Sequence, residues 1–98
     1  MVNTKLKKQI DDRQIQIFKA LADPIRLEII EYLKHTDHEI ACGEVGRAVD
    51  ISKTSGSYHF KLLESAGLIN TRREAREKYV TLNKSTFDKY VTDFYRNI

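Results

Sequence analysis

The stretch SKTSGSYHFKLLESAGLI, residues 52–69, decides the fold predicted for this chain. It opens with a serine, a residue type that commonly caps helix N-termini, and Gly67 ends the helical pattern. Phe60 and Leu63 form an apolar face, while small polar side chains fill the first two turns. Because short hydroxyl side chains let a helix approach base edges closely, the pattern is typical of a helix that enters the major groove of DNA.

The candidate DNA contacts on this helix are the polar side chains of its first turns and the lysine just behind them. Hydroxyl groups donate to or accept from base edges and phosphates alike, and lysine pairs with phosphate. Tyr58 is expected to face the DNA, whereas its neighbour His59 is expected to be partly packed against the protein. The predicted contacts are Lys53, Thr54, Ser55, Ser57, Tyr58 and Lys61.

Three helices are predicted before this segment. The first spans residues 10–21. The second runs from Asp23-Pro24 to about Lys34, since aspartate suits the N-cap and proline the first helical position. The third spans residues 41–49 and has as its core face Val45, Ala48 and Val49.

A tight turn at Asp50-Ile51 joins the third predicted helix to the fourth. Aspartate tolerates a left-handed backbone better than most residues, and Ile51 can fill the angle between the two helices. At Gly46 the two helices are expected to approach so closely that a small residue is needed. Two helices joined in this way predict a helix-turn-helix over residues 41–66.

After Gly67 the pattern changes to alternation, which predicts a β-hairpin over residues 68–82. Its two strands, residues 68–73 and 78–82, flank a short turn. The hairpin is rich in basic side chains, which could reach phosphates or the minor groove beside the helix, as the wing of a winged helix does. These side chains are Arg72, Arg73, Arg76 and Lys78.

A last helix is predicted over residues 85–96, with Ser85 as its cap. Its apolar stripe suits a core and a dimer interface equally well. The predicted fold is therefore mainly α with a small β-hairpin (α+β): four helices, the wing and a fifth helix. We expect a single domain over residues 1–98, with a basic tail over residues 1–8.

Charge and composition limit the classes of function that are expected for this chain. The net charge is +3, but residues 23–50 carry seven acids against three bases, whereas residues 51–84 carry seven bases against three acids. One end of the domain therefore suits a polyanion. The chain lacks an apolar run of about 20 residues and an apolar signal core, and it has one cysteine, so a cytoplasmic protein without membrane contact is expected. No catalytic arrangement is recognisable, so neither enzymatic activity nor a cofactor is expected.

Three motifs in sequence order resemble the ArsR/SmtB family of bacterial winged-helix repressors. They are FKALADPIRLEIIEYL at residues 18–33, SGSYHFKLLESAGLI at residues 55–69 and RREAREKYVTLN at residues 72–83. The resemblance implies a homodimer that is built on the first and last helices and binds a two-fold operator in double-stranded DNA. The implied interface residues are Ile10, Ile17, Phe87, Tyr90, Val91 and Phe94.

The chain departs from this family at the metal sites. The two thiolate positions of the third helix hold Ala41 and Gly43, and the last helix has Asp88 and Asp93 but no histidine. We therefore expect neither of the family's usual metal sites, and the sequence leaves the inducer open. A weaker alternative is a metal site formed by His35, His38 and Cys42.

Two further departures concern the DNA-binding elements. Gly56 stands where the family has an apolar residue, so it either loosens the reading helix or lets it pack more closely. Ala75 replaces the glycine at the tip of the wing, which could change the turn type.

Two alternatives remain open at this point. The acidic surface of residues 23–50 would serve a winged-helix module that binds another protein and has lost DNA binding. Arg26 could contact phosphate, but it could equally pair with Glu28 or another acid within the chain.

Overall fold

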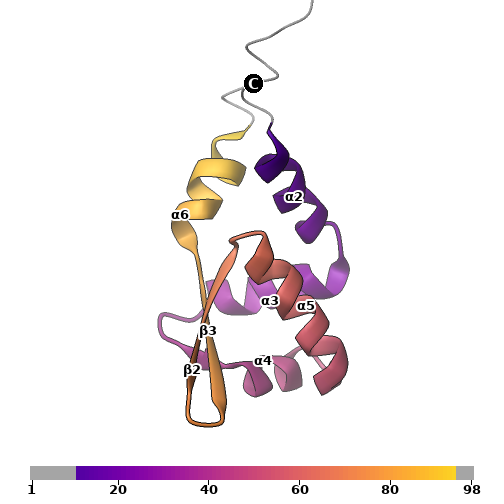
Figure 1. Cartoon of the computed structure of the whole chain (residues 1–98), viewed down its shortest axis with the longest axis vertical. Helices are drawn as coiled ribbons and strands as arrows, with labels where there is room; N and C mark the ends of the chain where they lie inside the picture. Colours follow the sequence, from indigo (N-terminus) through magenta and orange to yellow (C-terminus); the bar gives the residue numbers. More distant parts are fainter. Residues whose placement is uncertain (1–10, 95–98) are drawn as a thin grey trace, which may run out of the picture.

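The computed structural model describes residues 11–94, which form five helices and a short π-helical segment around a three-stranded sheet (Figure 1). This arrangement confirms the predicted class, mainly α with a small β-hairpin. In chain order the elements are α2 (Asp12–Leu21), α3 (Pro24–Lys34), β1 (Ile40–Ala41), α4 (Cys42–Ala48), α5 (Lys53–Ser65), β2 (Ile69–Glu74), β3 (Glu77–Leu82), α6 (Lys84–Phe87) and the π-helical η1 (Asp88–Thr92).

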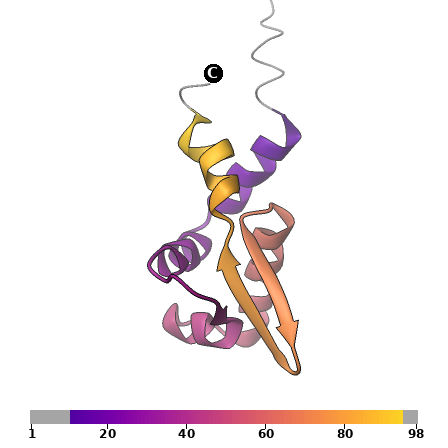
Figure 2. The same ribbon diagram turned by 90° about the vertical axis from the view of Figure 1, so that its left-hand side faces the viewer.

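The two ends of the long axis hold different elements. α2 and α6 lie at one end, and α4 and the tip of the β2–β3 hairpin lie at the other (Figure 1). The side view shows the hairpin running along the axis, with its tip farthest from α6 (Figure 2). The predicted helix-turn-helix and the wing therefore share one end of the domain.

The sheet has the strand order β1-β3-β2 and is antiparallel throughout. Val80 in the central strand pairs with Ile40 on one side and Thr71 on the other. The strand β1 is missing from the sequence prediction, and Ala41 belongs to it rather than to the third helix. A strand of two residues has no alternation of its own, so only its pairing with β3 defines it.

Local capping chemistry sets most helix boundaries as predicted. The Asp23 carboxylate accepts hydrogen bonds from the backbone N–H groups of Ile25 and Arg26 at 2.9 and 3.0 Å. The Ser52 hydroxyl accepts one from the Ser55 N–H group at 3.1 Å. Asp50 has a φ of 57°, which confirms the left-handed turn.

Two sequence predictions at helix ends are wrong. Asn83, not Ser85, caps the last helix: its side-chain oxygen accepts from the Thr86 N–H group, and the Ser85 hydroxyl donates to that same oxygen at 2.9 Å. The two capping residues lie only two positions apart, so the local pattern did not separate them. Ala48 is exposed rather than part of the core, because it lies at the end of a short α4 whose one buried residue is Val45.

One continuous core lies beneath the helices and the sheet. Ile17 is fully buried in it, so its prediction as a dimer contact is wrong: the side chain has no surface to offer a second chain. Ile10 lies outside the described residues. None of the helices within residues 11–94 is long and apolar enough to cross a membrane. The largest fully buried side chains are Ile17, Ile29, Leu33, Val45, Leu63, Leu68, Ile69 and Val80.

Candidate nucleic-acid interface

α5 exposes its predicted DNA-facing side and buries the opposite side. Tyr58 is 60% exposed, whereas His59 is only 7% exposed and is thus more deeply packed than the sequence predicted. The other buried residues of the helix are Gly56, Phe60 and Leu63. The exposed predicted contacts are Lys53, Thr54, Ser57, Tyr58 and Lys61, and Ser55 is half-buried.

Ile51 fills the angle between α4 and α5, as predicted. Its N–H group donates to the Gly46 carbonyl at 3.0 Å, and its side chain lies over Gly56. A Cβ added at Gly56 would lie 3.5 Å from Ile51 Cδ1, which is ordinary van der Waals contact. At Gly46 the nearest atom would be 3.8 Å away. Position 46 therefore has room for a Cβ atom, and the packing against Ile51 does not require glycine there.

A buried polar contact anchors the middle of α5 to α3. The Arg26 guanidinium donates to the Ala20 carbonyl at 2.6 Å, and its Nη1 lies 3.0 Å from His59 Nδ1. Arginine has no acceptor, so Nδ1 accepts and the imidazole is neutral with its proton on Nε2. The 3.9 Å approach of Asp23 to the same nitrogen is then not an ion pair. Arg26 is only 9% exposed, so the sequence alternative of a phosphate contact is wrong. No ion pair joins its side chain to Glu28 within residues 11–94, although its positive charge helps to lower the pKa of the nearby Asp23 carboxyl.

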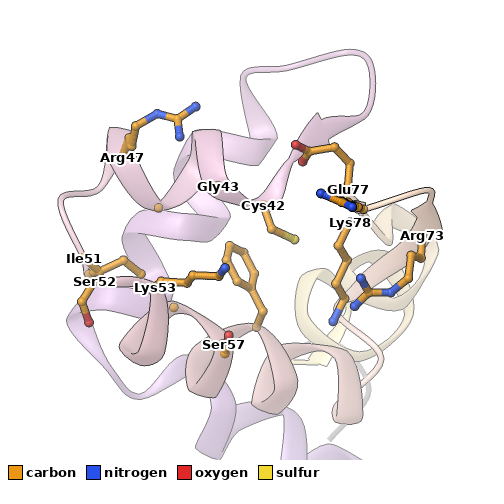
Figure 3. Close-up of a pocket in the computed structure, with 14 residues that line it drawn as sticks. Cys42, Gly43, Arg47, Ile51, Ser52, Lys53, Ser57, Arg73, Glu77 and Lys78 are labelled. Atoms are coloured by element: carbon orange, nitrogen blue, oxygen red, sulfur yellow. The ribbon is translucent and has the colours of Figure 1, made fainter.

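A basic groove of about 610 Å³ lies between α4, α5 and the wing (Figure 3). Its lining holds five cationic side chains and a single acid, Glu77. Within residues 11–94, no acid pairs with Lys53, Arg73 or Arg76. Arg47 was not among the predicted contacts, since it lies on the first helix of the helix-turn-helix, and only the packing of α4 brings it to the groove. The cations are Arg47, Lys53, Arg73, Arg76 and Lys78.

Three of the four predicted wing cations line the groove, and the fourth does not. Arg73 and Arg76 line the groove and have no acidic partner in the part of the chain that the structure describes. Arg72 does not line the groove and instead makes ion pairs with Glu39 and Glu74. Lys78 lines the groove and lies 3.9 Å from a Glu64 carboxylate oxygen.

Ala75 keeps the tip of the wing in a turn that usually takes glycine. Its φ is 57°, in the left-handed region where an L side chain costs about 1–2 kcal/mol. The two strands still pair up to Glu74 and Glu77, so the departure at this position leaves a two-residue turn.

The candidate metal ligands are not brought together. His38 is exposed and lies 2.9 Å from Asp37, and Cys42 is half-buried at the groove. Burial raises the pKa of the Cys42 thiol, which disfavours the thiolate that binds metals. Within residues 11–94 no group of three or more possible ligands gathers.

The candidate dimer residues lie at the end of the domain opposite the wing tip. Phe94 meets Phe18 of α2 edge to face, with ring centroids 4.8 Å apart. The Gln14 side chain donates to the Tyr90 carbonyl, which also ties α2 to η1. Ile15 of α2 is 44% exposed. The remaining predicted interface residues in this region, all half-buried, are Phe87, Tyr90 and Val91.

The fold and the basic groove define a winged helix-turn-helix DNA-binding protein. Residues 21–72 match the helix-turn-helix domain family. The HTH-type transcriptional regulator YceK of Bacillus subtilis is 49% identical over 92 residues, which cover 93% of this chain and 92% of YceK. The transcriptional repressor SdpR of the same organism is 36% identical over 67 residues, covering 68% and 72%.

A solved structure supports the same class. The solution structure of the homodimeric winged helix-turn-helix DNA-binding domain of Mb0332 from Mycobacterium bovis, a possible ArsR-family transcriptional regulator, has a TM-score of 0.72 and 27% identity. The match covers 83% of this chain and 74% of that one. The present chain belongs to the ArsR/SmtB family of winged helix-turn-helix transcriptional regulators.

Proposed function

We propose that this protein is a dimeric transcriptional repressor that binds a two-fold symmetric operator, with one α5 in the major groove of each half-site. The observation that carries the proposal is the polar first half of α5 facing outward beside a groove lined by five cations and one acid. Base edges specify the sequence and phosphates position the protein, and this surface offers groups for both.

In this proposal the side chains of α5 and those of the wing have different roles in DNA binding. Ser57 and Tyr58 face base edges, and Thr54 and Ser55 serve base edges and nearby phosphates. Lys53, Lys61 and the groove arginines neutralise flanking phosphates, with Arg73 and Arg76 next to the minor groove. Lys53, Arg73 and Arg76 have no acidic partner within residues 11–94, so DNA phosphates would be their counterions.

The dimer would form on the end that holds α2 and η1. The exposed Ile15 and the half-buried aromatic residues around Tyr90 supply apolar surface there, far from the wing tip. The homodimeric state of Mb0332, a protein of the same fold, supports this arrangement. A two-fold axis through this end would present two copies of α5 to one face of a duplex.

The test is operator binding by the wild type and by the double variant Ser57→Ala, Tyr58→Ala. Gel shifts with the native upstream region and with random DNA should show a loss of about tenfold or more on the operator and little on random DNA. The control Ser65→Ala changes an exposed residue at the other end of α5 and should bind as the wild type does. Sedimentation of the wild-type complex should give two chains per operator.

Equal losses on both DNAs would exclude Ser57 and Tyr58 as base-reading residues. A wild type with no salt-sensitive DNA binding would instead favour a protein-binding module. A complex with one chain per operator would contradict the dimer.

A further inference from the structure

Arg72 and Arg73 are neighbours in β2 but occupy different environments. Arg72 Nε and Nη2 donate to the two carboxylate oxygens of Glu39 at 2.8 and 2.7 Å. Its Nη1 donates to Glu74 at 2.6 Å, and its guanidinium lies over the Tyr79 ring at 5.1 Å. All three guanidinium nitrogens are therefore engaged within the protein. Arg73 has no such partner within residues 11–94 and lines the groove.

The contact between Arg72 and Glu39 differs from an ordinary surface ion pair. Isolated exposed pairs contribute little, but a bidentate arginine–carboxylate pair within a network has fixed geometry. The pair joins residues 33 positions apart, from the segment just before β1 to the wing. Arg72 also holds the pKa of the Glu39 carboxyl below its usual value, so the carboxylate is charged at neutral pH.

A second contact fixes the wing to α5. The Thr71 hydroxyl donates to Glu64 at 2.6 Å, and Lys78 approaches the other oxygen of the same carboxylate at 3.9 Å. Successive side chains of a strand point to opposite faces. Holding Arg72 on one face of β2 therefore directs Arg73 to the other, toward the groove where Figure 3 shows it.

We propose that Glu39 and Arg72 form a clamp that positions the wing for DNA, and that Arg72 is a positioning residue rather than a phosphate contact. The inference rests on the proposed DNA-binding function. It removes Arg72 from the predicted DNA contacts and gives an acidic residue, Glu39, a role in DNA affinity.

Whether Glu39→Gln weakens or strengthens operator binding distinguishes the clamp from a simple effect of net charge. Removing a negative charge from a DNA-binding protein should strengthen binding if only net charge matters. The clamp instead predicts about fivefold weaker operator binding for Glu39→Gln, a size typical of lost coupling between contacting residues. The control Glu31→Gln removes the same charge from an exposed α3 residue that lies outside the groove and has no ion pair within residues 11–94, and it should bind as tightly as the wild type or more tightly.

The salt dependence gives a second discriminating readout. Arg72→Ala should weaken binding about as much as Glu39→Gln, and the double variant should show no further loss. The slope of log affinity against log salt should stay unchanged in Arg72→Ala, because no phosphate contact is lost. Tighter binding by Glu39→Gln, or a slope reduced by about 0.9 in Arg72→Ala, would overturn the clamp.

Hydrogen exchange of the free protein tests the clamp without DNA. The amides of β2 and β3 should exchange faster in Glu39→Gln than in Glu31→Gln, whose wing is unaltered and keeps the clamp. Faster exchange in Glu39→Gln together with no DNA binding by the wild type would contradict the proposed function. It would still support the contact between Glu39 and Arg72 as the one that positions the wing. Equal exchange in the two variants would contradict the clamp even if the wild type bound its operator.

Discussion

The reading helix α5 and the outer part of the β2–β3 wing are held to the domain by different kinds of contact. α5 is fixed by burial: Phe60 and Leu63 lie in the core, and His59 accepts from the buried Arg26. The base of the wing is also buried, through Ile69 and Val80, but its outer part is held by exposed charges, through Glu39 on one side and Glu64 on the other. Buried contacts are screened far less by salt than exposed ones. The orientation of α5 should therefore be insensitive to salt, whereas that of the wing should depend on it.

The largest effect is expected where the anchor of α5 is removed. Arg26→Met leaves the Ala20 carbonyl and His59 Nδ1 without their donor in a buried site, and the free energy of unfolding should fall by about 2–3 kcal/mol. Urea unfolding followed by circular dichroism measures this loss, which should be the same at low and high salt. Lys34→Met on the exposed side of the same helix is the control and should change stability by less than about 0.5 kcal/mol.

A loss of stability in Arg26→Met that disappeared at high salt would contradict this difference between α5 and the wing, because α5 would then also be held by contacts that salt screens. Wild-type stability in Arg26→Met would show that the apolar contacts of Phe60 and Leu63 hold the helix alone.

A smaller effect, confined to DNA binding, is expected at the groove side of the wing. Arg73→Ala should weaken operator and random DNA alike and lower the salt slope by about 0.9, because one phosphate contact is lost. The free energy of unfolding should not change, since Arg73 makes no ion pair within residues 11–94. Titrations at several salt concentrations measure the slope. An unchanged slope would mean that Arg73, like Arg72, acts within the protein.

The parts of this fold that were predicted from the sequence are those set by local chemistry. Capping by Asp23 and Ser52, the left-handed Asp50 and the alternation of the wing each depend on a few consecutive residues. These signals were sufficient to place α5 and the hairpin to within a residue or two. The competition between Ser85 and Asn83 shows where such signals become ambiguous.

The contacts that hold the DNA-facing elements could not be predicted in the same way. Arg26 with His59, and Glu39 with Arg72, both join residues 33 positions apart. Their pairing depends on how helices cross and on the register of β2 with β3. The sequence therefore showed four equivalent wing cations, and only the three-dimensional arrangement separates Arg72 from Arg73.

The smallest effect is expected at Gly56, where α5 packs on Ile51. Gly56→Ala should raise the free energy of unfolding by about 0.5–1 kcal/mol, because alanine restricts the unfolded chain and suits a helix interior. Its methyl group would meet Ile51 Cδ1 at 3.5 Å, an ordinary contact, so no strain opposes the gain. Gly67→Ala is the contrasting control: its φ of 78° and the nearby Arg13 side chain should make it destabilising. A loss of stability in Gly56→Ala would mean that the burial holding α5 leaves no room for one methyl group, whereas a gain with unchanged operator affinity would show that Gly56 does not loosen the reading helix.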